Sequence, residues 1–256
     1  MQISTYFPRN LTAIAAILLP VLAHAQVTQK PDGEWRSLLT AGASIATGNT
    51  DAKSASLGAD VIKLTTSDKL AFNATGAYGR SDGVTTAEHL AGTGFYSRDL
   101  TPAWFGFGEV NLLRDKIADI SARATLGAGV GYHVIKLPDQ TFDLSAGVAY
   151  THDKYERDLV IADESRSTYS HAELLVAEES SNKLSDTTTF KQKLTVFPGL
   201  SHAGGVRTVF DAGLSVAMTT RLALTATLSH RYNSQPGVGV DKNDMLFVTG
   251  VSLRFD

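Results

Sequence analysis

Long stretches of strict two-residue alternation are the feature that most restricts how this chain can fold. Between residues 121 and 135 one set of alternate positions carries Ala, Leu, Val and Tyr, and the other carries Arg123, Thr125, three glycines and His133. Similar alternation occurs at 141–151 and 222–233. Because successive side chains of a β-strand point to opposite faces, each segment predicts a strand with one apolar and one polar face.

The number and length of these segments favour a membrane barrel. Strands of soluble domains usually have about five or six residues, whereas a tilted membrane-spanning strand needs about 9–11. A soluble sandwich or lipocalin-like barrel would have shorter strands and an inward apolar face. We therefore predict an all-β fold, a transmembrane antiparallel up-and-down β-barrel of about 12 strands, over residues 35–256. The expected strands are 35–47, 53–64, 69–80, 86–98, 103–113, 121–135, 141–152, 166–178, 187–197, 206–217, 221–233 and 244–255.

The connections alternate in length, which predicts the orientation of the barrel. Outer-membrane barrels have short periplasmic turns, longer outside loops and, with an even strand count, both chain ends on the periplasmic side. Aromatic residues near strand ends predict interfacial girdles. The short connections are 65–68, 99–102, 136–140, 180–186 and 218–220, and the long polar ones are 152–166, 198–205 and 234–243. The girdle residues are Trp35, Phe72, Phe95, Trp104, Tyr132, Phe142, Phe190 and Phe255 at one end, and Tyr78, Tyr150 and Tyr232 at the other.

The first 25 residues read as a cleaved secretory signal peptide. Arg9 precedes an apolar run at 11–22, and Ala23 and Ala25 form a small-x-small cleavage site. The mature chain then begins with a short periplasmic segment at 26–34. Export and the barrel pattern together predict the cell outer membrane as the location, with outer-membrane lipid and the barrel-assembly machinery as partners and a monomer as the oligomeric state.

Composition narrows the possible functions. Removing the signal peptide takes away one cation and no acid, so the formal charge shifts from −3 to −4. The mature chain therefore lacks the excess of basic residues that is typical of nucleic-acid-binding proteins. The absence of cysteine excludes disulfides and thiolate-ligated metal sites.

Local motifs give weak support for chemistry. His230 and Ser234 share a strand face, but their separation is about 13 Å at ~3.3 Å per residue, and that face is the lipid-facing one. His171 and Glu173 supply two ligands, which do not make a metal site. The glycines of 127–131 are expected to make room in a crowded lumen, and the segment Gly48–Asp51 is expected to form a turn. We therefore expect no enzyme, catalytic residue, metal or cofactor.

The polar face carries charges of both signs, which favours paired networks across a narrow lumen over a one-sign ring of an ion-selective pore. A plain solvated interior is the alternative. The predicted network consists of Glu109, Arg123, Asp143, Arg207 and Asp211, with the first four pairing across the lumen. The full inward set is Asp60, Glu88, Glu109, Arg123, Asp143, Glu173, Lys191, Lys193, Arg207, Asp211, Arg231, Asp244 and Arg254.

Across the whole mature chain, the order and spacing of several short motifs resemble the domain-of-unknown-function 481 family, whose members are called salt-induced or outer-membrane proteins. The resemblance implies an outer-membrane barrel of unassigned activity. One departure is that Asp256 follows Phe255, whereas such barrels usually end in an aromatic residue. The motifs are Leu39-Thr-Ala-Gly-Ala-Ser-Ile-Ala-Thr-Gly-Asn-Thr50, Ser54–Asp60, Leu112-Leu-Arg-Asp115, Gly127–Tyr132, Asp153-Lys-Tyr155, Arg231-Tyr-Asn-Ser-Gln-Pro236 and Asp244.

Three functions remain open from the sequence. The first is an envelope component or a narrow conduit for small solutes. The second is surface binding or adhesion through the long 152–166 loop. The third is a lipid-modifying enzyme.

Overall fold

The structure, a computed structural model, describes residues 30–46, 52–161, 164–200, 205–236 and 242–255. The signal peptide with its cleavage site, the turn at 48–51 and Asp256 lie outside the described residues. The strands are β1 (Trp35–Ala46), β2 (Ala52–Leu64), β3 (Asp68–Ser81), β4 (Val84–Asp99), β5 (Trp104–Asp115), β6 (Ile120–Lys136), β7 (Gln140–Ile161), β8 (Glu164–Lys183), β9 (Thr188–Pro198), β10 (Val206–Ala217), β11 (Leu222–Asn233) and β12 (Asn243–Phe255).

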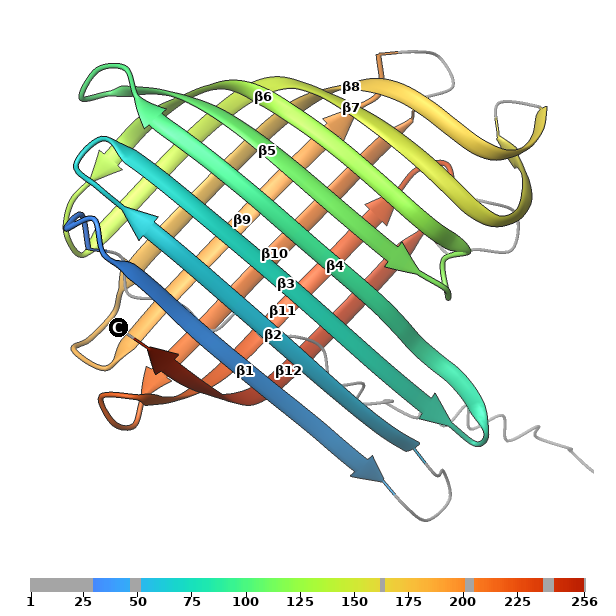
Figure 1. Cartoon of the computed structure of the whole chain (residues 1–256), viewed down its shortest axis with the longest axis horizontal. Coiled ribbons are helices and arrows are strands. Elements are labelled where there is room, and N and C mark those ends of the chain that lie inside the picture. The colour runs from blue at the N-terminus through green and yellow to red at the C-terminus, as the bar shows by residue number, and fades with distance from the viewer. Residues whose placement is uncertain (1–29, 47–51, 162–163, 201–204, 237–241, 256) are drawn as a thin grey trace, which may run out of the picture.

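The twelve described strands form one closed antiparallel barrel in which each strand pairs with its sequence neighbours, and β12 closes on β1 (Figure 1). Closure sets Leu39 opposite Leu253 and Ala41 opposite Val251. The predicted strand number and up-and-down order are therefore confirmed. Most predicted strand limits lie within two residues of the observed ones, because the alternation that predicts a strand stops where the strand stops.

The two ends of the barrel differ. We call the end that holds the start of β1 and the close of β12 the terminal end, and the opposite end the loop end (Figure 1). The terminal end carries the connections predicted to be short. The loop end also has a tight connection, because Asp82 and Gly83 alone join β3 to β4, with φ of 47° and 83°. Two consecutive positive φ angles are typical of the type I′ hairpin turn.

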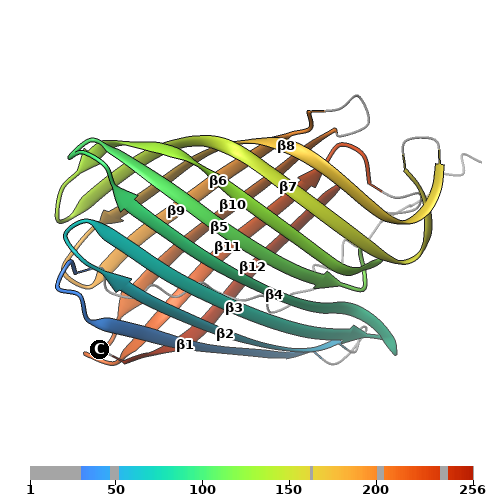
Figure 2. The same ribbon diagram turned by 45° about the horizontal axis from the view of Figure 1, so that its top comes forward.

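Residues 152–161 and 164–166 belong to β7 and β8, so the prediction of a loop there was wrong. The paired ends of the two strands project past the rest of the loop end as a long hairpin (Figures 1 and 2). Ladder pairing continues from Lys154 opposite Thr168 to Ile161 opposite Glu164, with a register shift between Lys154 and Leu159. Outside a membrane neither face of a strand needs apolar residues, so a polar sequence still forms this hairpin.

The outer face of the barrel is apolar along its middle. On β6, Leu126, Val130 and Val134 are exposed, whereas Thr125, one position from Leu126, is buried inside. This arrangement confirms the inside and outside sets that the alternation predicts for β6. Among the described residues, no helix is long and apolar enough to cross a membrane.

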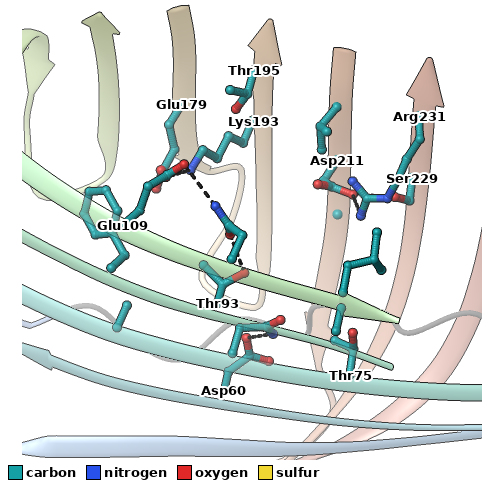
Figure 3. Close-up of a pocket in the computed structure, with 18 of the residues that line it drawn as sticks. Asp60, Thr75, Thr93, Glu109, Glu179, Lys193, Thr195, Asp211, Ser229 and Arg231 are labelled. Carbon is teal, nitrogen blue, oxygen red and sulfur yellow. Dashed lines mark hydrogen bonds and ion pairs between the residues drawn. The ribbon is translucent and has the colours of Figure 1, made fainter. Parts of the chain in front are cut away.

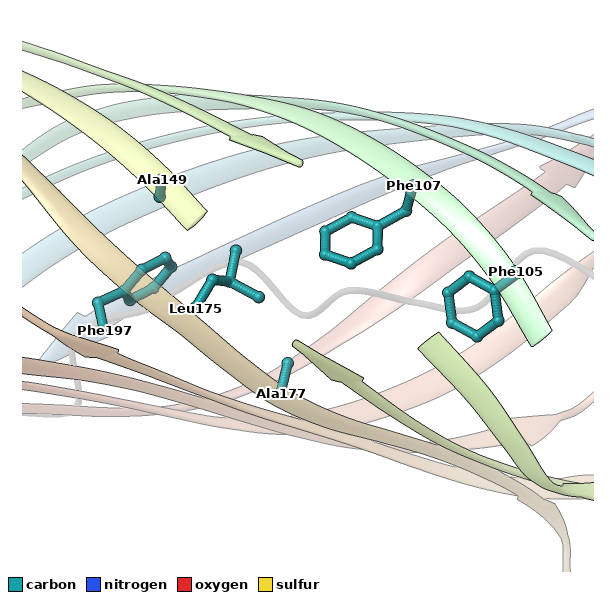
Figure 4. Close-up of a cluster of buried hydrophobic side chains, with 6 residues drawn as sticks. All are labelled: Phe105, Phe107, Ala149, Leu175, Ala177 and Phe197. Atoms are coloured by element: carbon teal, nitrogen blue, oxygen red, sulfur yellow. The ribbon is translucent and has the colours of Figure 1, made fainter. Parts of the chain in front are cut away.

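Part of the interior wall is apolar as well. A buried apolar cluster lies inside the barrel (Figure 4). Phe95 and Val209 pack against this cluster. The prediction that Phe95 belongs to an interfacial girdle was therefore wrong, because its position on β4 points inward. The cluster itself consists of Phe105, Phe107, Ala149, Leu175, Ala177 and Phe197.

Glycines of β6 make room for this cluster. A Cβ atom at Gly131 would stand 2.0 Å from the Phe105 ring, and one at Gly129 would stand 2.2 Å from the carbonyl oxygen of Ala146. The glycines therefore let large side chains of β5 lie over β6. Phe105 pairs opposite Gly131, Phe107 opposite Gly129, and Glu109 opposite Gly127.

Candidate functional site: the lumen of the barrel

The lumen contains a cavity of about 430 Å³. Side chains from β2 to β6 and from β8 to β11 line it, so the cavity lies inside the barrel (Figure 3). Most of the lining residues are charged or polar, but apolar residues also take a large share of the wall, among them Ile62, Phe95, Leu113, Phe197 and Val209. A volume in this range is typical of small-molecule sites.

Two ion pairs cross the lumen. Lys69 of β3 donates to Glu179 of β8, with 3.0 Å between Nζ and Oε1. Lys193 of β9 lies 3.9 Å from Glu109 of β5 (Figure 3). Several strands separate the partners in each pair, so these side chains reach across the interior and narrow it.

A polar network closes part of the loop end. Glu173, which is fully buried, accepts hydrogen bonds from Arg207 at 2.9 and 2.5 Å and from Thr151 at 2.8 Å. Thr151 is also hydrogen-bonded to Thr125. The guanidinium of Arg207 lies 4.7 Å from the centre of the Phe197 ring, which adds a cation–π contact.

A second buried pair lies beside this network. Arg123 of β6 donates to both carboxylate oxygens of Asp153 on the neighbouring strand β7, at 2.5 and 3.1 Å. The hydroxyl of Tyr155 also donates to Asp153. Asp153 is 1% exposed, so its charge depends on these two donors.

At the terminal end, His133 bridges two carboxylates. Its Nδ1 lies 2.7 Å from Asp143 and its Nε2 lies 3.1 Å from Asp99, which also contacts Lys136. A carboxylate only accepts hydrogen bonds, so both contacts require two ring protons or a protonated carboxyl group. The Phe105 ring packs against the imidazole ring, with 4.7 Å between the two ring centres.

Residues 30–34 are attached to the same end. Arg36 donates to both carboxylate oxygens of Asp32, at 2.8 and 2.5 Å. These hydrogen bonds hold the pKa of the Asp32 carboxyl group well below its usual range. The amide of Gly33 donates to the carbonyl oxygen of Leu64, so the segment lies against β2.

All five residues of the predicted lumen network face inward, but none pairs with another. Glu109 has Lys193 and Asn111, Arg123 has Asp153, Asp143 has His133, and Arg207 has Glu173. Asp211 accepts from Ser229 at 2.5 Å and lies 3.6 Å from Arg231. The partners that sequence reasoning missed include Lys69, Asp99, Asp153 and Glu179, which continue the same alternation as the residues that it chose.

Glu88 was wrongly assigned to the lumen. It is next to His89, which lines the cavity, so it points the opposite way and pairs with Lys116 at 2.6 Å. The register of β3 and β4 shifts nearby, between Gly79 and Arg80, where the ladder skips Thr86 of β4.

His230 and Ser234 have different hydrogen-bond partners in the structure, whereas His171 and Glu173 contact each other. His230 is 3.3 Å from Asn243, and the Ser234 hydroxyl accepts from the amide of Val206. His171 lies 3.3 Å from Glu173, and its Nδ1 has no hydrogen-bond partner among the described residues. No group of three or more potential metal-ligating side chains occurs in the described part of the chain.

A closed barrel with an apolar outer face and a polar lumen has the architecture of a transmembrane β-barrel protein. The chain belongs to the family described as "Protein of unknown function, DUF481", whose family model matches residues 39–255. This match confirms the resemblance seen in the sequence. A comparison with curated proteins finds no match.

Solved structures of barrel proteins align with most of the chain. The translocator domain of the autotransporter NalP from Neisseria meningitidis is 15% identical, with 86% of this chain and 88% of that chain covered and a TM-score of 0.46. The NanC porin is 12% identical, with 86% of this chain and 96% of that chain covered and a TM-score of 0.44. Both TM-scores lie below 0.5, so the fold described above rests on this chain's own strand pairing.

Proposed function

We propose that this chain is a monomeric outer-membrane protein whose lumen is a narrow conduit for small solutes. The observation that carries the proposal is the polar cavity of about 430 Å³ inside a barrel with an apolar outer face. An apolar outer face suits lipid, and a polar lumen suits water and dissolved solutes. The same architecture implies the assembly machinery of such barrels as a partner. The proposal assigns the chain no catalytic step.

The narrowness of the conduit follows from what fills the barrel. About eight strands leave room only for side chains, and sixteen to eighteen enclose a water-filled channel. A barrel of twelve strands lies between these limits, so its contents decide the width. The crossing pairs Lys69–Glu179 and Lys193–Glu109 and the apolar cluster around Phe107 occupy much of the interior. We therefore expect small solutes to pass and larger ones to be excluded.

Liposome swelling tests this proposal. Refolded protein would be inserted into vesicles that contain a large impermeant polymer, and the vesicles would be diluted into isotonic solutions of glycine, arabinose, sucrose or raffinose. We expect swelling in glycine that declines steeply with solute size. Swelling no faster than that of protein-free vesicles would overturn the conduit, and equal swelling in glycine and raffinose would indicate an open porin instead.

The projecting β7–β8 hairpin supports a second candidate, surface binding. Its outer part carries the exposed charged residues Lys154, Glu156, Arg157 and Asp158, which suit a polar partner outside the membrane. Replacing 156–167 with a two-residue Asn-Gly turn shortens the hairpin and leaves the barrel strands in place. Loss of cell-surface adhesion with unchanged solute flux would favour this candidate over the conduit.

A further inference from the structure

Lys191 is a cation in the lumen that has no ion-pair partner among the described residues. It lines the cavity from an inward position of β9, next to the inward position of Lys193. Lys193 has Glu109 at 3.9 Å, but no hydrogen bond or ion pair connects Lys191 to another residue in the described part of the chain. A cation inside a barrel without a partner is unusual, because charges removed from bulk water are normally paired.

The carboxylates that line the cavity already have closer donors. Each of the four accepts a hydrogen bond at 3.1 Å or less from a neighbour other than Lys191. Each of these four carboxylates is therefore engaged by another donor, and none lies within ion-pair distance of the Lys191 ammonium. The four donor–acceptor pairs are Lys69–Glu179, Asn111–Glu109, Asn73–Asp60 and Ser229–Asp211.

The surroundings of Lys191 add further positive charge. Lys69 and Arg254 both act on it as like charges, and Glu179 and Asp60 oppose them. The Nε of Arg254 is buried and has no hydrogen-bond partner among the described residues. Within the cavity lining, Lys191 therefore presents an ammonium without an acceptor among the described residues, and an anion would supply one.

The adjoining wall is apolar and aromatic. The Phe95 ring has the ammonium groups of Lys69 and Lys193 at 5.5 and 5.6 Å from its centre. Phe197 and Val209 line the same cavity. A ligand that satisfies Lys191 and also covers this wall has one negative group and a small apolar body.

We propose that the lumen contains a binding site for small organic carboxylates, in which Lys191 contacts the carboxylate and the wall around Phe95 contacts the apolar part. The inference rests on the proposed conduit, since it names the class of solute that the conduit selects. The test therefore includes a binding measurement that does not depend on flux.

Isothermal titration of the refolded full chain with sodium benzoate tests the site directly. Benzoate carries both features, acetate has the carboxylate without the ring, and benzyl alcohol has the ring without the charge. We expect benzoate to bind more tightly than either. Because a hydrogen bond to a charged group is lost, Lys191→Gln should weaken benzoate binding about tenfold or more, and Lys191→Arg should preserve most of it.

Lys63→Gln is the matched control. Lys63 also lies on a strand, but its ammonium sits over the Trp35 ring on the outer face, 5.6 Å from the ring centre, so its loss should leave benzoate affinity unchanged. Equal affinity in the unmodified chain and Lys191→Gln, or benzyl alcohol binding as well as benzoate, would overturn the proposal. Benzoate binding that needs Lys191 but is accompanied by no solute flux would support the site and remove the conduit. Solute flux without benzoate binding would support the conduit and remove the binding site.

Discussion

Gly129→Ala should destabilise the barrel more than its single methyl group suggests. The new Cβ would stand 2.2 Å from the carbonyl oxygen of Ala146 and 2.7 Å from the Cα of Gly147, both backbone atoms of β7. A rotamer change can move neither atom, so β6 and β7 must separate where Gly129 pairs opposite Gly147. Such overpacking costs about 1–3 kcal/mol, and we take about 3 here because backbone is involved.

An opposing effect has to be subtracted. Alanine in a strand is favoured over glycine by about 0.5–1 kcal/mol, so the net loss is about 2 kcal/mol. Gly108→Ala is the control, because its Cβ would meet nothing nearer than 3.9 Å, and it should gain about 0.5–1 kcal/mol. The two variants should therefore differ by about 3 kcal/mol in free energy of unfolding.

Urea titration in lipid vesicles measures this difference, with the fluorescence of the chain's two tryptophans as the signal. Refolding should be checked by a shift in gel mobility between heated and unheated samples, since a folded barrel migrates differently from the unfolded chain. Coincident unfolding curves for Gly129→Ala and Gly108→Ala would falsify the close approach of β6 and β7.

Three other changes test the outer face, the buried pairs and closure. Leu126→Arg places a charge on the middle of the outer face and should lower the free energy of unfolding by about 2–4 kcal/mol in the same titration. Val134→Arg, near the terminal end, should lower it by only about 0–1 kcal/mol. Equal losses would show that the assigned membrane depths are wrong. Arg123→Ala leaves the buried Asp153 carboxylate without its main partner, so it should lower the free energy of unfolding by about 3–5 kcal/mol and raise solute leak. Arg157→Ala breaks a more exposed pair and should lower it by at most about 1 kcal/mol. Similar losses in the two variants would contradict the difference in burial. Truncation after Asp244 removes nearly all of β12 and opens two unpaired edges, so outer-membrane yield measured by fractionation should fall to near zero, and a normal yield would refute the closing strand.

The strand number and most strand limits could be predicted because both depend on local alternation. Within the barrel, each residue of β6 or β11 must suit either the apolar outer side or the polar lumen, and the sequence records that choice at every position. Residues 156–161 of β7 lie past Tyr155, the last residue that pairs with β6, and this outer part of the hairpin projects beyond the rest of the loop end, where neither face is constrained. Its polar residues carry no alternation, so the sequence predicts a loop where the ladder continues.

The partners in the lumen could not be predicted from the sequence. Alternation places Glu109 and Arg123 inside, but the partner of each depends on strand register and on how far each side chain reaches. Arg123 pairs with the residue directly opposite on β7, whereas Glu109 faces a glycine and extends across to Lys193. Once the register of two strands is known, a glycine opposite a long inward side chain indicates that this side chain finds its partner on a distant strand.

The groups that cross the lumen are the flexible ends of lysine and glutamate side chains, which can move when a solute passes. Lys69 and Glu179 are 22% and 36% exposed, so water in the lumen reaches both groups and screens part of their attraction. Separating them requires no change in strand pairing, because the backbone of β3 and β8 stays in place while two side chains rotate. A carboxylate solute that approaches Lys191 also offers an acceptor to Lys69 and competes with Glu179 for it. Binding of such a solute then loosens the pair that narrows its path, so selection and passage depend on the same contacts.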